Sequence, residues 1–457
     1  MGDQEQDERK DSGYYDVESP EIIYDYSAGD EVVKAGSLAG LVGHLTHHDK
    51  LDASFNRTFL TTHTHFTTGN ELFQSLVQRY GCPPPEGMNP KEATEWSTKT
   101  KPLIQLRVMN ILRQWLETFW TEPKDVNPSA VLVQIRTFAS AIESSAVQQQ
   151  LLEIIECRLA GVERIKRSRS SISTPPKPIL PRKLKVEKLQ FMKIDAREIA
   201  RQLTLMESCM YGKIRPNELL HKNWQRQDQP APKIRALIRY FNQLSSWVGA
   251  LIVAESDLKK RTQVIGHLIN VANTCHELQN YSAVISILSG LESAPVYRLG
   301  RTWAMVTQRD CDTLQPLQAL TSSDQNYNTY RESLRRAVPP CVPFLGLFLK
   351  DFIFASDGNP PLTANGLINF TKYSLLSSTI HNLQRFQEAP YSLHPVPELQ
   401  EYLASQLQCA GDLHDLWERS CRLEPRGRGD GNRESDTYTA TGGMTTSMVI
   451  ACMILDE

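Results

Sequence analysis

The sequence lacks the short motifs by which many enzymes bind nucleotides or activate a nucleophile. Its 457 residues contain no G-x-x-x-x-G-K-[ST] phosphate loop, no G-x-G-x-x-G fingerprint and no G-x-S-x-G elbow. The nine cysteines are scattered and never form a C-x-x-C pair, which argues against a zinc ribbon or a disulfide framework and favours reduced thiols. The missing motifs argue against ordinary bond-making chemistry without excluding it, and we expect no cofactor and no metal site.

The sequence also lacks an excess of either charge and any long hydrophobic run. Lys and Arg total 50 against 52 Asp and Glu, so no overall field selects nucleic acid or an acidic membrane. The acidic start of the chain does not resemble a secretory signal peptide, and the apolar stretch near its end is too short to span a bilayer. We expect a cytoplasmic protein without a nucleic-acid partner.

Histidines near the N-terminus are the candidates for a metal site. His44, His47 and His48 fall on adjacent faces of a predicted helix, and His63 and His65 follow. They have no supporting carboxylate pattern and no H-E-x-x-H arrangement. We therefore interpret them as surface or helix-end histidines.

Hydrophobic spacing divides most of the chain into two helical domains. Apolar residues recur at helical intervals across 31–160, which predicts a bundle of about five helices. A second, larger set is predicted across 189–425. Asp195 is expected to cap its first helix, with Glu198 completing a capping box. Because no alternating strand pattern is present, the expected fold class is all-α.

The remaining segments differ in composition from both domains. Residues 161–188 are basic and rich in Ser and Pro, and we interpret them as an interdomain linker. Residues 1–28 are acidic and 426–457 are rich in Gly, Arg, Ser and Thr, so both are expected to be disordered tails. The linker is either a solvated tether or a target for a basophilic kinase, whose candidate sites are Ser168, Ser170 and Ser171.

The most distinctive segment is PPCVPFLGLFLKDFIFASDGN at 339–359. Apolar side chains repeat along one helical stripe, and others lie off that stripe, so the predicted helix is apolar on nearly every side. It ends at Asp357, Gly358 and Asn359, which begin a turn. Such a helix is either buried in a core or presents one face to a partner.

Four blocks resemble the catalytic domain of Ras-family guanine-nucleotide exchange factors, in a fungal-like form. They are IDAREIARQLTLMESCMYGKIRPNELL (194–220), YSAVISILSGLESAPVYRL (281–299), PPCVPFLGLFLKDFIFASDGNP (339–360) and LINFTKYSLL (367–376). They keep the family's order and spacing, which assigns 189–425 to this domain. The segment that begins at Val32 is similar, more loosely, to the helical Ras-exchanger motif module, which assigns 31–160.

The resemblance implies that the chain promotes GDP release from a Ras-like small GTPase and catalyses no bond chemistry. In the family, a helical hairpin displaces switch I of the GTPase. By that resemblance Ile353 would face the magnesium and phosphate site, Asp357 would compete for the protein groups that bind phosphate, and Asn359 would contact switch I. Family members usually carry Glu at the position of Asp357.

The same resemblance implies that switch II is held by a hydrophobic pocket that includes Ile238, Tyr327 and Phe344, with Arg239 binding an acidic group. From the residues alone, the alternative for the three pocket residues is ordinary core packing, and the alternative for Arg239 is a solvated helix face.

The resemblance also indicates a partner and a place in the cell. Ras is the first expected partner, with Rap and Ral as alternatives. Recruitment to the inner face of the plasma membrane is expected through partners. The rival hypothesis for the function is a non-catalytic scaffold that binds a GTPase or signalling protein.

Overall fold

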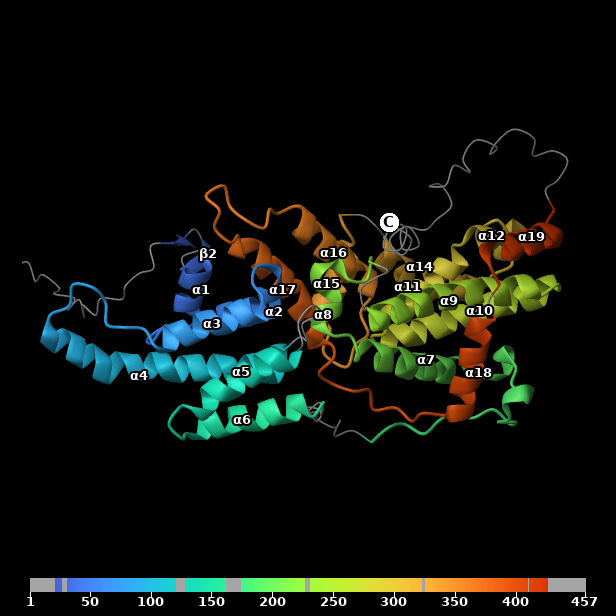
Figure 1. Ribbon diagram of the computed structural model, residues 1–457. Coiled ribbons are helices and arrows are strands. Elements are labelled where there is room, and N and C mark those ends of the chain that lie inside the picture. The colour runs from blue at the N-terminus through green and yellow to red at the C-terminus, as the bar shows by residue number, and fades with distance from the viewer. Residues whose placement is uncertain are drawn as a thin grey trace, which may run out of the picture. The chain divides into compact units, whose positions relative to one another are not determined.

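The computed structural model describes residues 21–26, 31–120, 128–161, 174–226, 231–322, 325–409 and 411–425 (Figure 1). The serines at 168, 170 and 171, the C-terminal tail and most of the N-terminal tail lie outside these residues. The described chain is almost entirely helical, which confirms the all-α fold class. No helix in these ranges is long and apolar enough to cross a membrane.

The chain forms two compact units. Unit 1 comprises residues 1–165 and 356–378, and unit 2 comprises residues 166–355 and 379–457. The chain passes from one unit to the other within α16 (Leu345–Asp357) and returns within α17 (Phe370–Arg385). The turn that joins these two helices therefore belongs to the same unit as the N-terminal helices.

Among its described residues, unit 1 contains six further α-helices and a small sheet. These elements are β1 (Ile22–Asp25), β2 (Val32–Gly36), α1 (Leu38–Leu45), α2 (Ala53–Thr62), α3 (Gly69–Tyr80), α4 (Pro90–Gln114), α5 (Pro128–Ser140) and α6 (Ala146–Leu159). Helices α3 and α4 begin at capping boxes, formed by Thr68 with Glu71 and by Asn89 with Glu92. These caps satisfy amide groups that the first helical turn leaves without partners.

A small two-stranded sheet accompanies the helices, although the sequence shows no alternating strand pattern. Strands β1 and β2 pair antiparallel, with Ile22 opposite Gly36 and Asp25 opposite Val32. Strand β1 lies in the segment that the sequence assigned to the acidic tail. Both strands are too short for a period-two pattern to stand out from the sequence.

The histidine cluster of unit 1 is only partly at the surface. His63 follows the end of α2 but is buried, and its Nδ1 lies 2.8 Å from the carbonyl oxygen of Leu60. Burial lowers the pKa of His63 to about 4. Among the described residues, no group of three His, Cys, Asp or Glu side chains is arranged to hold a metal ion.

Unit 2 is built around long helices that pack against one another. Its elements are α7 (Ala196–Tyr211), α8 (Pro216–Leu219), α9 (Pro232–Ala254), α10 (Leu258–Glu277), α11 (Tyr281–Leu291), α12 (Ala294–Tyr297), α13 (Gly300–Trp303), α14 (Gln308–Thr321), α15 (Asn328–Arg336), α18 (Pro397–Gln408) and α19 (Leu413–Leu423).

Helix α7 begins as predicted, but its expected capping box is absent. The Asp195 side chain accepts a hydrogen bond from the amide of Arg197, which confirms the cap. Glu198 is buried instead of reaching back to the cap. Its carboxylate accepts hydrogen bonds from the Ile179 amide at 2.9 Å and from the Gln202 side chain at 2.7 Å. Tertiary partners therefore override the local capping pattern.

Helices α9 and α11 touch at their backbones. A Cβ atom on Gly290 would lie 2.5 Å from the carbonyl oxygen of Ser245 and 2.6 Å from the Cβ of Val248, so only glycine fits there. Nearby, the Ser286 hydroxyl donates a hydrogen bond to the carbonyl oxygen of Phe241 at 2.7 Å. The two helices are thus fixed against each other at van der Waals contact.

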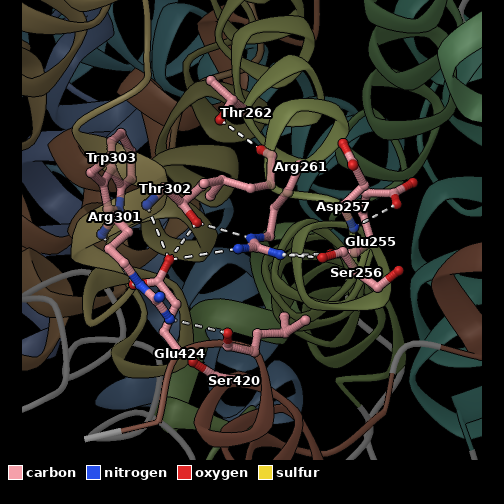
Figure 2. A network of polar contacts seen from close by, with 12 residues as sticks. Glu255, Ser256, Asp257, Arg261, Thr262, Arg301, Thr302, Trp303, Ser420 and Glu424 are labelled. Carbon is pink, nitrogen blue, oxygen red and sulfur yellow. Dashed lines mark hydrogen bonds and ion pairs between the residues drawn. The ribbon is translucent and has the colours of Figure 1, made fainter. Parts of the chain in front are cut away.

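A buried polar network fixes the C-terminal helix of unit 2 (Figure 2). The Glu424 carboxylate accepts hydrogen bonds from the Thr302 amide at 3.0 Å, from the Thr302 hydroxyl at 2.7 Å and from the Arg301 amide at 3.0 Å. The Arg261 guanidinium lies 3.6 Å from this carboxylate and donates to the Thr302 hydroxyl and to the Glu255 carbonyl, both at 2.9 Å. Every charge in this network therefore has polar partners.

Candidate functional site

Helix α16 carries three of the predicted site residues on or just beyond its exposed end. Its first half is buried, whereas Ile353 is half-buried and the neighbouring Phe354 is 65% exposed. Asp357 is the last residue of the helix and is exposed. Because Ile353 and Asp357 are four residues apart, they lie on the same face. Asn359 follows in the turn and is half-buried.

A buried lysine of α17 holds the turn after α16. The Lys372 ammonium donates hydrogen bonds to the carbonyl oxygens of Ser356 at 2.7 Å and of Asn359 at 2.8 Å. Lys372 is only 8% exposed. Carbonyl oxygens at a helix C-terminus carry partial negative charge, so a cation is favourable there. Lys372 thereby fixes the backbone on both sides of Asp357 and Gly358.

The rest of this turn is fixed by strand-like and aromatic contacts within unit 1. The Ile368 amide donates to the Gly36 carbonyl oxygen at 2.9 Å, and the Gly36 amide donates back to Ile368 at 3.2 Å. The ring of Phe370 stacks on the ring of Phe55, with centroids 4.5 Å apart. The segment that carries Asn359 is therefore bonded to β2 and packed on α2.

An apolar pocket in unit 2 brings together Ile238 and Phe344. It is lined mainly by side chains of α9 and of the chain entering α16, namely Leu237, Ile238, Phe241, Ser282, Phe344, Leu345 and Gly346. The rings of Phe241 and Phe344 lie 5.1 Å apart. Arg239, the residue after Ile238, is exposed. The pocket is thus lined mainly by hydrocarbon, and the helix that carries Ile238 also carries an exposed cation.

The helix that carries Ile238 is positioned by a carboxylate from the preceding helix. Helix α9 begins at Pro232, and no side chain of its N-cap residue Ala231 can accept a hydrogen bond. Glu218 of α8 supplies the acceptor, since its Oε2 binds the amides of Lys233 at 2.9 Å and Ile234 at 3.1 Å. A carboxylate at a helix N-terminus is favoured by the helix dipole.

Helix α15 is joined to α16 by a two-pronged ion pair. The Arg331 guanidinium donates from Nη1 to Oδ2 of Asp351 and from Nη2 to Oδ1, both at 2.7 Å. The Asp351 carboxylate raises the pKa of Arg331. Close by, the buried hydroxyl of Tyr330 accepts a hydrogen bond from the Phe344 amide at 2.8 Å. These contacts set the direction in which α16 leaves the pocket.

Tyr327 is buried but does not line the apolar pocket. It precedes α15 with a left-handed backbone (φ 61°), and the Lys350 ammonium lies 5.5 Å from the centre of its ring. The structure thus places Ile238 and Phe344 in one pocket, leaves Arg239 exposed on the same helix as Ile238, and sets Tyr327 beside α16.

Sequence reasoning missed Lys372, Glu218, Tyr330, and the pair Arg331 and Asp351. Lys372 is visible in the sequence as the one charged residue of the block LINFTKYSLL. The other contacts join residues from separate helices, and no local pattern predicts them.

Comparison with known families shows which protein family the chain belongs to. The RasGEF domain profile matches residues 198–374, and the RasGEF N-terminal motif profile matches residues 32–138. The chain belongs to the RasGEF family. Both matches agree with the resemblance found in the sequence, and the first covers every residue of the apolar pocket.

RasGEF-family relatives are found in fungi, amoebae and animals. The chain is 34% identical over 418 residues to cell division control protein 25 of Candida albicans, covering 89% of this chain and 31% of that protein. It is 34% identical over 421 residues to Ras guanine nucleotide exchange factor A of Dictyostelium discoideum, covering 87% of this chain and 66% of that protein. It is 28% identical over 440 residues to the son of sevenless protein of Drosophila melanogaster, covering 88% and 27%. The chain therefore spans only part of the length of these relatives.

Proposed function

We propose that this RasGEF-family chain promotes GDP release from a Ras-like small GTPase. The observation that carries the proposal is the arrangement along α16, in which an apolar pocket lies at the helix start and an exposed carboxylate at its end. An exchange factor moves no covalent bonds; it binds the nucleotide-free GTPase better than the nucleotide-bound form. A ten-thousand-fold acceleration of release needs about 5.5 kcal/mol of such differential binding.

Each part of the site has a distinct role in this proposal. The pocket around Ile238 and Phe344 receives apolar side chains of switch II, and Arg239 pairs with an acidic group beside them. Ile353 brings hydrocarbon towards the magnesium site, where an ion needs oxygen ligands. Asp357 presents a carboxylate to the protein groups that bind phosphate, and Asn359 contacts switch I.

The fixed turn after α16 supports this role for Asp357. Asp has one methylene less than the Glu usual in the family, so its carboxylate reaches less far. A backbone held on both sides of Asp357 by Lys372 loses little entropy when the tip enters the GTPase. Preorganisation of this kind favours a shorter side chain that is aimed correctly.

The proposal extends to the domain organisation and the partners. Residues 189–425 form the catalytic domain, 31–160 the accompanying module, 161–188 the linker, and the two ends the tails. Ras is the first candidate partner, followed by Rap and Ral. The protein acts in the cytoplasm and meets lipid-anchored GTPases at the inner face of the plasma membrane.

Nucleotide release from purified GTPases tests the proposal. Ras, Rap and Ral proteins loaded with fluorescent GDP are mixed with the full 457-residue chain, and we expect accelerated release from at least one. Arg239→Glu should lower the rate at least about tenfold without changing the thermal midpoint, because it reverses an exposed charge. Arg309→Glu is the matched control, since Arg309 is also exposed in unit 2.

Phe344→Ala probes the pocket itself, and we expect it to abolish exchange in a protein that remains folded by circular dichroism. An unchanged rate would refute the placement of switch II. Absence of acceleration on all three GTPases, with binding retained, would favour the scaffold hypothesis.

A further inference from the structure

An extended segment that the proposed exchange site does not use runs along α7 of unit 2 (Figure 1). It spans residues 174–185 and contains four prolines, which favour a polyproline II conformation with three residues per turn. Two contacts tie its backbone to α7. The Ile179 amide donates to Glu198, and the Arg201 guanidinium donates to the Lys177 carbonyl oxygen at 3.2 Å.

The three-residue repeat separates an inward ridge from two outward ridges. Pro175, Pro178 and Pro181 share one ridge and are all half-buried. The outward ridges are exposed and consist of Lys177, Leu180 and Lys183 on one side and Pro176, Ile179 and Arg182 on the other. Leu180 is 52% exposed and Ile179 36%. The outward surface is therefore a pair of aliphatic side chains flanked by cations.

The basic character continues beyond this segment towards α7. Between Lys177 and Lys193 the chain has six basic residues and one acidic residue, although the whole protein has a formal net charge of −2. All six basic residues are exposed. Met192, which is 44% exposed, adds a third apolar side chain to this surface. Positive charge and exposed hydrocarbon are thus concentrated in one stretch.

A basic, proline-rich segment could bind a proline-recognition domain, a nucleic acid or an anionic membrane, and the orientation of its prolines argues against the first. Pro178-x-x-Pro181 has the spacing read by aromatic-lined grooves for proline-rich peptides. Those two prolines, however, lie on the ridge turned towards the domain, and the backbone at Lys177 and Ile179 is already bonded to α7. The segment also has no aromatic side chain on which a nucleic-acid base could stack.

An anionic bilayer matches all the outward features. Lys and Arg side chains near such a surface are attracted by acidic headgroups, and exposed aliphatic side chains enter the interface between them. We propose that residues 177–193 form a membrane-docking surface that holds unit 2 against anionic phospholipid. The surface acts independently of the proposed exchange site, and its binding is reversible and sensitive to salt because the charges are exposed.

Vesicle flotation with the full chain tests this proposal. We expect binding to phosphatidylcholine vesicles that contain about 30 mol% phosphatidylserine and none to phosphatidylcholine alone. The triple variant Lys177→Gln, Arg182→Gln, Lys183→Gln should lower the partition coefficient about 100-fold, since each cation contributes roughly a factor of five. Leu180→Gln should lower it several-fold by removing the exposed apolar group.

A matched triple variant controls for overall charge. Lys259→Gln, Lys260→Gln, Arg309→Gln removes three exposed cations elsewhere in unit 2 and should leave vesicle binding within about twofold of the parent. Exchange on a soluble GTPase in the absence of vesicles should be equal in both triple variants and the parent. That assay separates failure of the docking proposal from failure of the exchange proposal.

Three results would overturn the docking proposal. One is equal binding to neutral and anionic vesicles, and another is anionic binding that survives the Lys177, Arg182, Lys183 variant. The third is absence of vesicle binding together with capture of the chain by immobilised SH3 domains that Pro178→Ala, Pro181→Ala abolishes. That last result would assign the segment to a proline-binding groove.

Discussion

Two glutamates buried in unit 2, Glu207 and Glu424, have pKa values shifted in opposite directions. Burial raises the pKa of Glu207 to about 7, and the neighbouring Ser282 and Asn280 side chains oppose the rise only in part. Burial also disfavours the charged form of Glu424. There the Thr302 side chain and the amides of Arg301 and Thr302 outweigh it and lower the pKa.

The opposite pKa shifts mark two kinds of region in unit 2. Glu424 belongs to a network that stabilises the fold, and Glu207 lies beside the apolar pocket. Glu424 ties the C-terminal helix to α13 through hydrogen bonds and nearby guanidinium groups (Figure 2). Glu207 lies near Ser282, which lines the apolar pocket, and Asn280, whose side chain caps α11. A buried carboxyl group without comparable compensation lowers stability. The domain tolerates that cost next to its candidate binding surface.

Removing the compensated carboxylate should have the largest effect on stability. Glu424→Ala leaves the Arg261 guanidinium, which is buried, without its carboxylate partner. We expect the free energy of unfolding, measured in urea, to fall by about 3 kcal/mol. Glu401→Ala, on the exposed face of α18, is the control and should change it by less than about 0.5 kcal/mol. A loss below about 1 kcal/mol for Glu424→Ala would show that the network contributes little.

Removing the charge of Glu207 should raise the free energy of unfolding, whereas Glu424→Ala lowers it. The size of this gain should depend on pH. In the folded protein the pKa is raised from 4.5 to about 7, so the folded state binds more protons between these values and stability falls as pH rises. Glu207→Gln cannot ionise. Its unfolding free energy relative to the parent should therefore increase from about pH 4.5 to 7, by up to about 3 kcal/mol, and stay level above.

Urea unfolding of the parent and Glu207→Gln at several pH values from about 5 to 8 measures this difference. Glu401→Gln, an exposed carboxyl on the same unit, should show no such trend. A difference between Glu207→Gln and the parent that does not change with pH would mean that Glu207 titrates normally in the folded state.

Lys372 is a buried cation, in contrast to the two buried glutamates. Of the three substitutions, the one at Lys372 should have the smallest free-energy effect. Lys372→Met removes the donor to the Ser356 and Asn359 carbonyl oxygens but keeps an unbranched apolar stem as far as Cε. We expect exchange to slow about tenfold, which corresponds to about 1.4 kcal/mol. Affinity of the pocket for the GTPase should change less, because Ile238 and Phe344 are untouched.

Lys372→Arg keeps the charge and should recover part of the exchange rate, whereas Lys259→Met, at an exposed lysine, should leave it unchanged. If Lys372→Met weakens GTPase binding and exchange equally, the lysine supports the fold rather than the orientation of the tip.

The sequence predicted the helices well where their determinants are local. Helical periodicity and the Asp195 cap predicted where α7 begins, and the helix starts at Ala196. Both the helical period and the cap depend on residues within a few positions of one another. The resemblance named Ile238 and Phe344, and both line the apolar pocket, while their contact with switch II stays a prediction.

The failures have a common physical cause. Glu198 was assigned to a local cap but bonds the Ile179 amide of the preceding segment. Lys372 binds carbonyl oxygens from the end of another helix, and Arg331 pairs with Asp351 of α16. Polar groups buried by packing take whichever partner the tertiary structure supplies. Spacing along one sequence does not encode that choice.

The backbone contact at Gly290 fixes the spacing of two helices that line the apolar pocket. Helix α9 supplies one wall of the pocket and α11 contributes Ser282, yet the two helices cannot separate or approach without losing or violating the contact with Ser245 and Val248. Under the proposed exchange mechanism, we therefore expect a change of GTPase preference to come from replacing side chains that line the pocket and not from a change in the spacing of these helices.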